Sequence, residues 1–159
     1  MKGRIRAKKM RLSHQINNYY CGPAVVVMVL RAHGIHATQR SAARLLHTTK
    51  AVGTSTKRLV GALRSFSLRV NAGNGRSLKD IHRALQEKSI VIVCYTEPRE
   101  HQGHYAVVAG FRGTSILLFS PDERGDRPVL MPLKEFEERW HDPLFTRSKR
   151  WAAFVHFSQ

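Results

Sequence analysis

Cys21 stands between a polar run and a long apolar one, with Gln15 six residues before it and Gly22-Pro23 directly after it. A free thiol has a pKa near about 8.5, which a helix N-terminus, nearby cations or a histidine partner lowers. Pro23 favours the first turn of a helix, so we expect Cys21 at the positive end of that helix. The local sequence contains no carboxylate to oppose ionisation. This pattern favours a cysteine nucleophile.

A cysteine nucleophile works with a histidine base whose second ring nitrogen is held by an acceptor. Of nine histidines, His104 is the best candidate, because it opens the strand-like run 104–111 and a rigid sheet would aim its ring. This run and the run 115–120 predict a β-hairpin with a three-residue loop. In that register His104 lies opposite Asp122, which is therefore the expected orienting carboxylate.

Acyl transfer also needs hydrogen-bond donors for the oxyanion. The backbone N–H of Cys21 at the start of its helix is one candidate, and the side-chain amide of Gln15 is the other. This chemistry proceeds through a thioester and needs no metal ion or cofactor, so none is expected. The other cysteine, Cys94, lies in an apolar run and is expected to be an ordinary buried thiol.

The elements that must position these residues follow from periodicity and capping. The run 24–30 favours a strand by propensity and a buried helix by its continuity, and Pro23 and Gly34 favour a helix over 21–33. Helices are also predicted at 38–46, 55–66, 78–88 and 133–140, and strands at 68–70, 89–95, 104–111, 115–120 and 151–157. Helices followed by an antiparallel sheet indicate an α+β domain.

A chain of 159 residues with 42% hydrophobic content suits a single domain, predicted at 12–159 after a flexible basic arm at 1–11. No apolar stretch approaches the ~18 residues that a membrane helix needs. The basic N-terminus has no apolar signal-peptide core after it. A cytoplasmic location is therefore the default expectation, with export by another route left open.

The formal net charge of +16 belongs entirely to the first half of the chain. Residues 1–79 contain 16 Lys and Arg and no Asp or Glu, whereas residues 80–159 contain 11 of each sign. Such a field attracts nucleic acid, anionic lipid headgroups or acidic proteins, although a solubilising face is an equal alternative. An acidic peptide or protein substrate and nucleic acid are thus the candidate partners. The sequence does not indicate an oligomeric state.

The segments "QINNYYCGPA" (15–24) and "GHYAVVAGF" (103–111) resemble the bacteriocin-processing cysteine peptidases, which cleave double-glycine leaders. Members occur as domains of peptide-exporting ABC transporters and as free-standing proteins, and this chain resembles the latter. The resemblance covers about residues 12–157. It implies a papain-like fold, with an N-terminal helical half packed on a C-terminal antiparallel sheet. It maps the nucleophile to Cys21, the base to His104 and the oxyanion glutamine to Gln15.

One position departs from the family pattern. The family usually has an Asp-Pro pair that orients the histidine, whereas this chain reads Ser120-Pro121-Asp122. Alignment on the proline puts Ser120 at the orienting position, but the hairpin register favours Asp122. The two side chains would point to the same side of a strand. Asp122 is therefore the expected orienting residue, with Ser120 as the alternative.

The leading functional hypothesis is a cysteine peptidase that cleaves after small residues, such as the Gly-Gly pair of a leader peptide. A glutamine deamidase or acyltransferase would use the same residues, because a thioester can be resolved by water or by an amine. The third hypothesis is a non-catalytic basic module that binds nucleic acid or an acidic partner.

Overall fold

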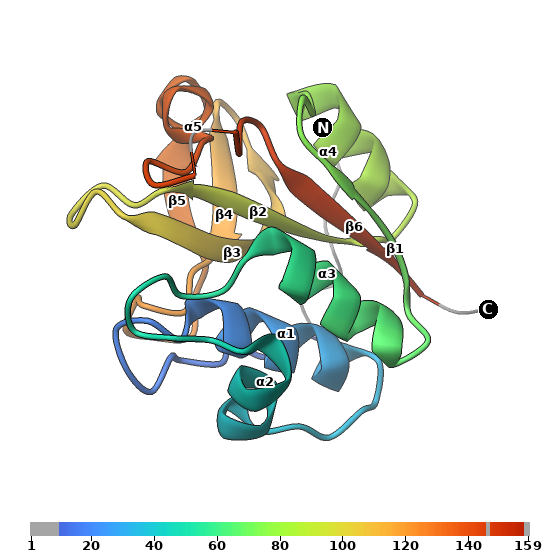
Figure 1. Ribbon diagram of the computed structural model, residues 1–159. Coiled ribbons are helices and arrows are strands. Elements are labelled where there is room, and N and C mark those ends of the chain that lie inside the picture. The colour runs from blue at the N-terminus through green and yellow to red at the C-terminus, as the bar shows by residue number, and fades with distance from the viewer. Residues whose placement is uncertain (1–9, 146, 158–159) are drawn as a thin grey trace.

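The computed structural model describes residues 10–145 and 147–157. Helices lie on both sides of a sheet (Figure 1), and the residues of two apolar cores agree with this arrangement. No helix in the described ranges is long and apolar enough to cross a membrane. The helices are α1 (Cys21–Ala32), α2 (Gln39–Leu46), α3 (Thr56–Ser65), α4 (Leu78–Gln86) and α5 (Leu133–Arg139).

The sheet has six antiparallel strands in the order β1-β6-β2-β3-β4-β5. The last strand in the sequence therefore lies inside the sheet, between the first and the second. The strands are β1 (Arg69–Gly73), β2 (Ile90–Thr96), β3 (Gly103–Arg112), β4 (Ser115–Phe119), β5 (Val129–Pro132) and β6 (Ala152–His156). The α+β class is confirmed. The edge strand β5 is not predicted from the sequence, because it has only four residues and ends in proline.

Helix α1 is buried on all sides, which explains its unbroken apolar sequence. Residues 24–30 are at most 1% exposed, so packing overrides the strand propensity of their valines. The helix ends as the sequence predicts: Gly34 adopts a positive φ of 76°. The N–H groups of Gly34 and Ile35 then donate to the carbonyls of Arg31 and Leu30, both at 2.9 Å.

The N-terminal boundaries of α2, α3 and α4 are set by side-chain caps. Thr38 and Ser41 form a reciprocal capping box at the start of α2, and Ser77 and Asp80 form another at the start of α4. The hydroxyl of Ser55 accepts from a backbone N–H in the first turn of α3. These caps satisfy backbone donors that the helix itself leaves free. The predicted helix starts are correct for this reason.

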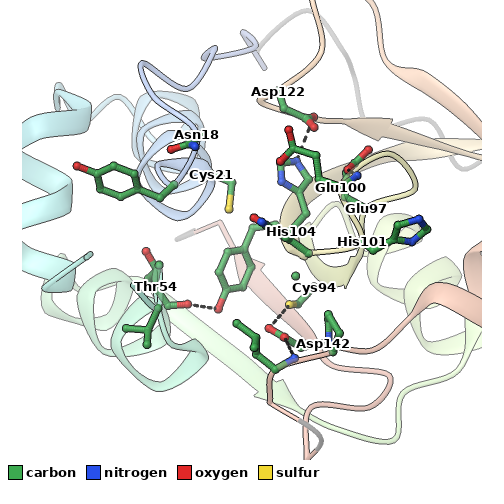
Figure 2. A pocket seen from close by; sticks show the side chains of 18 of the residues that line it. Asn18, Cys21, Thr54, Cys94, Glu97, Glu100, His101, His104, Asp122 and Asp142 are labelled. Carbon is green, nitrogen blue, oxygen red and sulfur yellow. Dashed lines mark hydrogen bonds and ion pairs between the residues drawn. The ribbon is translucent and has the colours of Figure 1, made fainter. Parts of the chain in front are cut away.

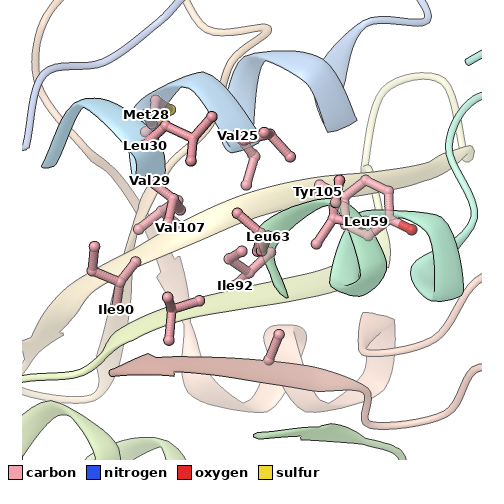
Figure 3. Close-up of a cluster of buried hydrophobic side chains, with 14 of the residues drawn as sticks. Val25, Met28, Val29, Leu30, Leu59, Leu63, Ile90, Ile92, Tyr105 and Val107 are labelled. Carbon is pink, nitrogen blue, oxygen red and sulfur yellow. The ribbon is translucent and has the colours of Figure 1, made fainter. Parts of the chain in front are cut away.

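Two apolar cores lie on the two faces of the sheet, and β2 contributes to both. Figure 3 shows the core between α1, α3 and the sheet. Alternate β2 residues enter each core: Ile90, Ile92 and Cys94 face the first, and Val91, Val93 and Tyr95 the second. Residues 1–9 of the predicted basic arm lie outside the described part of the chain. Met10 is 6% exposed and belongs to the first core.

The β3–β4 hairpin differs from its prediction in two compensating ways. Arg112 pairs with Ser115, so the loop has two residues and the predicted three-residue loop is wrong. Gly113 adopts the positive φ that such a tight turn requires. A bulge at Ala109 then moves the register back by one residue, and Val107 pairs with Phe119 as predicted. The bulge thus restores the pairing that brings the end of β4 beside His104.

Candidate active site

Cys21 is the first residue of α1, and its thiol is free and half-buried. Figure 2 shows its sulfur facing a cleft beside His104. Burial raises the pKa of the thiol, but the hydrogen bond and charge of His104 outweigh it, helped by hydrogen bonds from the backbone of Tyr105 and Gly22. The pKa therefore lies below its ordinary value. No acidic residue in the first turn opposes the thiolate.

His104 lies near the start of β3, opposite Tyr95 of β2, and is 6% exposed. The edge of its ring meets the Tyr95 ring, with 5.7 Å between centroids. Burial lowers the pKa of the imidazole, but hydrogen bonds and charges from Asp122 and Cys21 raise it to about 10. The surroundings of Cys21 and His104 therefore favour a thiolate–imidazolium pair.

Both candidates for the orienting position contact His104. Its Nε2 lies 2.9 Å from Ser120 Oγ and 3.2 Å from Asp122 Oδ1. The Ser120 hydroxyl also donates to Asp122 Oδ1. Burial raises the pKa of Asp122, but His104, Ser120 and Arg99 together hold it well below its usual range, so the carboxyl is ionised. The alternatives that the sequence leaves open are thus both present at the ring.

Gln15 lines the same cleft as Cys21. Its backbone N–H donates to the carbonyl of Pro121 at 3.0 Å, which ties it to the segment that carries Asp122. Its side-chain Nε2 donates to the Asn17 carbonyl at 2.8 Å. Since an amide nitrogen has two N–H groups, this bond leaves one of them available. The structure therefore brings together all four residues that the sequence singles out.

The cleft has a volume of about 570 Å³ and is lined by residues of both the helical half and the sheet half. Its walls come from the start of α1, the 50–54 loop, the β2–β3 turn and the 142–145 segment. Val52, Leu144 and Phe145 line it and are respectively 56%, 71% and 45% exposed. Exposed apolar side chains at a cleft commonly mark a binding surface. The volume lies within the range of about 300–1,000 Å³ that is usual for ligand-binding clefts.

The charge of the cleft differs from that of the whole protein. Among the residues that the structure describes, four acidic residues line it, against two Lys or Arg. Within residues 10–79, Lys50 is the one Lys or Arg in the lining. An acidic substrate segment would therefore meet the basic residues outside the cleft. The lining carboxylates are Glu97, Glu100, Asp122 and Asp142, and the two cations are Lys50 and Arg99.

Several residues of the site are not identifiable from the sequence. Asp142 Oδ1 accepts from the backbone N–H groups of Leu144 and Phe145 at 2.9 and 3.3 Å, so its carboxylate shapes one wall. The Cys94 thiol contacts Asp142 Oδ2 at 3.8 Å, and burial raises the pKa of that thiol well above its ordinary value. No local motif identifies Asp142, because it reaches the cleft through contacts with residues distant in the sequence, such as Cys94. The described residues contain no group of three or more His, Cys, Asp or Glu arranged to hold a metal ion.

The fold and the cleft agree with comparisons to known proteins. The chain is 21% identical to the peptidase domain of Streptococcus ComA, a bifunctional ABC transporter involved in quorum sensing, with a TM-score of 0.75 over 94% of this chain and 99% of that one. A putative C39-like peptidase from Bacillus anthracis is 14% identical, with a TM-score of 0.72 over 97% and 98% of the two chains.

A third solved structure is a double-glycine-motif protease from an AMS/PCAT transporter in complex with a leader peptide. It is 17% identical, with a TM-score of 0.71 over 98% of this chain and 95% of that chain. The search of curated proteins gave no match. The model of the Peptidase C39 family matches residues 9–151. The chain therefore belongs to the Peptidase C39 family, and it is a cysteine peptidase with the papain-like fold expected from the sequence.

Proposed function

We propose that Cys21 is the nucleophile of this peptidase, His104 its general base and acid, Asp122 an orienting carboxylate and Gln15 an oxyanion donor. The observation that carries the proposal is the contact between Cys21 and His104. The thiol at the start of α1 faces the cleft beside the imidazole, which helps hold the pKa of the thiol below its ordinary value, while the thiol helps raise the pKa of the imidazole. Such a pair supplies a thiolate near neutral pH.

In the first half-reaction, the Cys21 thiolate attacks the carbonyl carbon of the scissile peptide bond. The carbonyl oxygen becomes an oxyanion, for which the Cys21 backbone N–H and the Gln15 amide are the proposed donors. The carbon–nitrogen bond then breaks, and the His104 imidazolium gives its proton to the leaving amine. The products of this step are a free amine and a thioester on Cys21.

In the second half-reaction, neutral His104 removes a proton from a water molecule, which attacks the thioester carbonyl. The carbon–sulfur bond breaks and a carboxylic acid leaves, so Cys21 is again a thiolate and His104 an imidazolium. Each atom and proton is accounted for without a cofactor. An amine in place of water would give acyl transfer, and a glutamine side chain in place of a peptide bond would give deamidation.

The proposed substrate is a peptide or protein cut after small residues, such as Gly-Gly in a leader. Its support is the similarity of the fold to a protease solved with a leader peptide. The apolar rim of the cleft, with Leu144 and Phe145 exposed, would contact apolar residues of that peptide. Peptides with Gly-Gly, Ala-Ala or bulky pairs at the cut, compared by mass spectrometry, test this specificity.

The test of the catalytic proposal needs no substrate. The rate of alkylation of each cysteine by iodoacetamide is measured against pH by mass spectrometry, in the wild type and in His104→Ala. We expect Cys21 to react with an apparent pKa well below about 8.5, and His104→Ala to remove the shift. Buried Cys94 serves as an internal control, since its thiol should react slowly at every pH. A Cys21 that reacts like an ordinary thiol would contradict the proposal.

The basic first half favours a second, non-exclusive role in binding an anionic partner. Exposed cations on α2 and α3 have no acidic residue within residues 10–79 to neutralise them; they are Arg40, Arg44, Lys57, Arg58 and Arg64. Affinity for nucleic acid or an acidic protein should then fall steeply with salt and be unchanged by Cys21→Ala.

The reaction products separate deamidation from proteolysis. Deamidation releases ammonia, whereas proteolysis produces new amino termini.

A further inference from the structure

We propose that Ser120 is a positioning residue, and that Ser120 and Asp122 act in series as one orienting unit for His104. This inference rests on the proposed function, because it concerns the base of that same site. The Ser120 hydroxyl is the nearer acceptor for His104 Nε2, at 2.9 Å against 3.2 Å for Asp122 Oδ1. The carboxylate contacts both the hydroxyl and the ring.

The hydrogen bonds of this cluster can be assigned a single direction of donation, from His104 to Ser120 and from Ser120 to Asp122. A hydroxyl has one hydrogen to donate and two lone pairs to accept with. Asp122 is ionised and only accepts, so the hydrogen of Ser120 goes to Asp122. Ser120 then accepts from the His104 Nε2–H. The Ser120 hydroxyl thus both donates and accepts a hydrogen bond, as expected for a side chain that is 2% exposed.

This direction determines which nitrogen of His104 faces the thiol. If Nε2 carries a hydrogen that it donates to Ser120, the neutral ring has its lone pair on Nδ1. Because Nε2 bonds to Ser120, Nδ1 is the ring nitrogen that remains for the interaction with the Cys21 thiol. The base is therefore held in the tautomer that can accept a proton from the thiol or from water. The hydroxyl is the nearer acceptor for the ring, and the carboxylate beside it supplies the negative charge.

The order Ser-Pro-Asp explains why two residues share this task. Ser120 directly follows β4 and is buried, whereas Asp122 lies beyond Pro121 and its side chain is 23% exposed. The outer oxygen of Asp122 is held by Arg99, whose Nη2 lies 3.3 Å from Oδ2. The carboxylate thus has its inner oxygen free for Ser120 and His104.

The test compares the Cys21 alkylation profile of wild type, Ser120→Ala, Asp122→Asn and the double variant. We expect Ser120→Ala to raise the apparent pKa of Cys21 by about one unit, which is about a tenfold loss of reactivity on the acid limb. Because the residues act in series, the double variant should lose no more than about the larger single loss. The matched control is Ser89→Ala: Ser89 is also buried and its hydroxyl bonds a histidine, His156, at 3.0 Å.

A rescue variant and a reference variant separate the outcomes. Ser120→Asp/Asp122→Ser puts the carboxylate before the proline and should keep the low apparent pKa; if it does not fold, the single and double variants decide. A Ser120→Ala profile that matches wild type and Ser89→Ala, or single losses that simply add, would overturn the series arrangement. If His104→Ala leaves the wild-type profile unchanged, the proposed Cys–His pair fails instead. Thermal unfolding of each variant identifies losses that come only from misfolding.

Discussion

Arg99 reaches from the β2–β3 turn to Asp122, with 3.3 Å between Nη2 and Oδ2, and its Nη2 also lies 2.9 Å from Glu123 Oε1. Its Nε contacts Glu97 Oε1 at 3.2 Å in the same turn. The turn that forms one wall of the cleft is thereby joined to the carboxylate beside His104. A change in this turn is therefore expected to reach the proposed base.

Substitution of Arg99 tests this link. Arg99→Met should lower peptide cleavage about two- to fivefold, a modest loss because the Arg99 side chain is 61% exposed and solvent screens the pair. High salt should reduce wild-type activity towards that of the variant. Arg124→Met is the control, because Arg124 is also exposed and lies outside the cleft lining. Equal salt dependence in both variants and wild type would contradict the link.

Stability should depend on pH through His104. Its pKa is raised to about 10 in the folded protein from 6.5, so folding favours the protonated ring. This stabilisation is fully present below pH 6.5 and is lost as pH rises through about 10. Urea unfolding at intervals between pH 6 and 10.5 measures it. His104→Ala should give a flatter curve over that interval, and an equally steep curve in the variant would contradict the assignment.

Gly22 follows the proposed nucleophile and lies against Thr54. A Cβ at position 22 would come 2.6 Å from the Thr54 Cβ, so α1 or the 48–54 loop must move in Gly22→Ala. We expect a loss of about 1–3 kcal/mol in the free energy of unfolding, together with reduced reactivity of Cys21. Denaturant unfolding and the alkylation rate measure the two effects.

Gly61 supplies the matched control for this substitution. It lies inside α3 with no heavy atom of the described residues within 4 Å of an added Cβ. Gly61→Ala should therefore stabilise the protein by about 0.5–1 kcal/mol, the difference in helix propensity. If both alanine variants change stability in the same direction, contact with Thr54 is not the reason why position 22 requires glycine.

Gln15 should affect the chemical step without affecting the thiol. Gln15→Ala is expected to lower kcat by about 10²–10³, the usual loss for one oxyanion donor. The pH profile of Cys21 alkylation should stay as in wild type, because no Gln15 contact contributes to the lowered pKa of Cys21. A variant that changes KM alone would place Gln15 in substrate binding instead.

The basic face of α2 and α3 should act on substrates at a distance from the cut. A peptide with an acidic segment should show a lower KM than its neutral counterpart at low salt, and the difference should vanish near about 1 M salt. Arg44→Gln/Arg58→Gln should remove part of the advantage, since both side chains are exposed. An unchanged ratio of the two KM values in this variant would assign the charge to solubility alone.

The sequence by itself determined the parts of this protein that depend on neighbouring residues. The caps at Thr38 and Ser77 mark the starts of their helices, because a side-chain oxygen three positions before a backbone N–H is a local feature of the sequence. The same holds for Cys21 at the start of α1 and for His104 near the start of β3. These two residues are predictable because each lies at or next to the start of an element that the local sequence identifies.

Only the tertiary structure decided how these residues meet. The predicted loop of the β3–β4 hairpin is wrong by one residue, and the bulge at Ala109 corrects the register by the same amount, which no local pattern shows. That register brings Ser120 and Asp122 together at His104, where the sequence offers them as alternatives. Contacts between distant segments depend on the summed geometry of turns, bulges and packing. The motif therefore gives the identity of the reacting groups, and the fold gives their orientation.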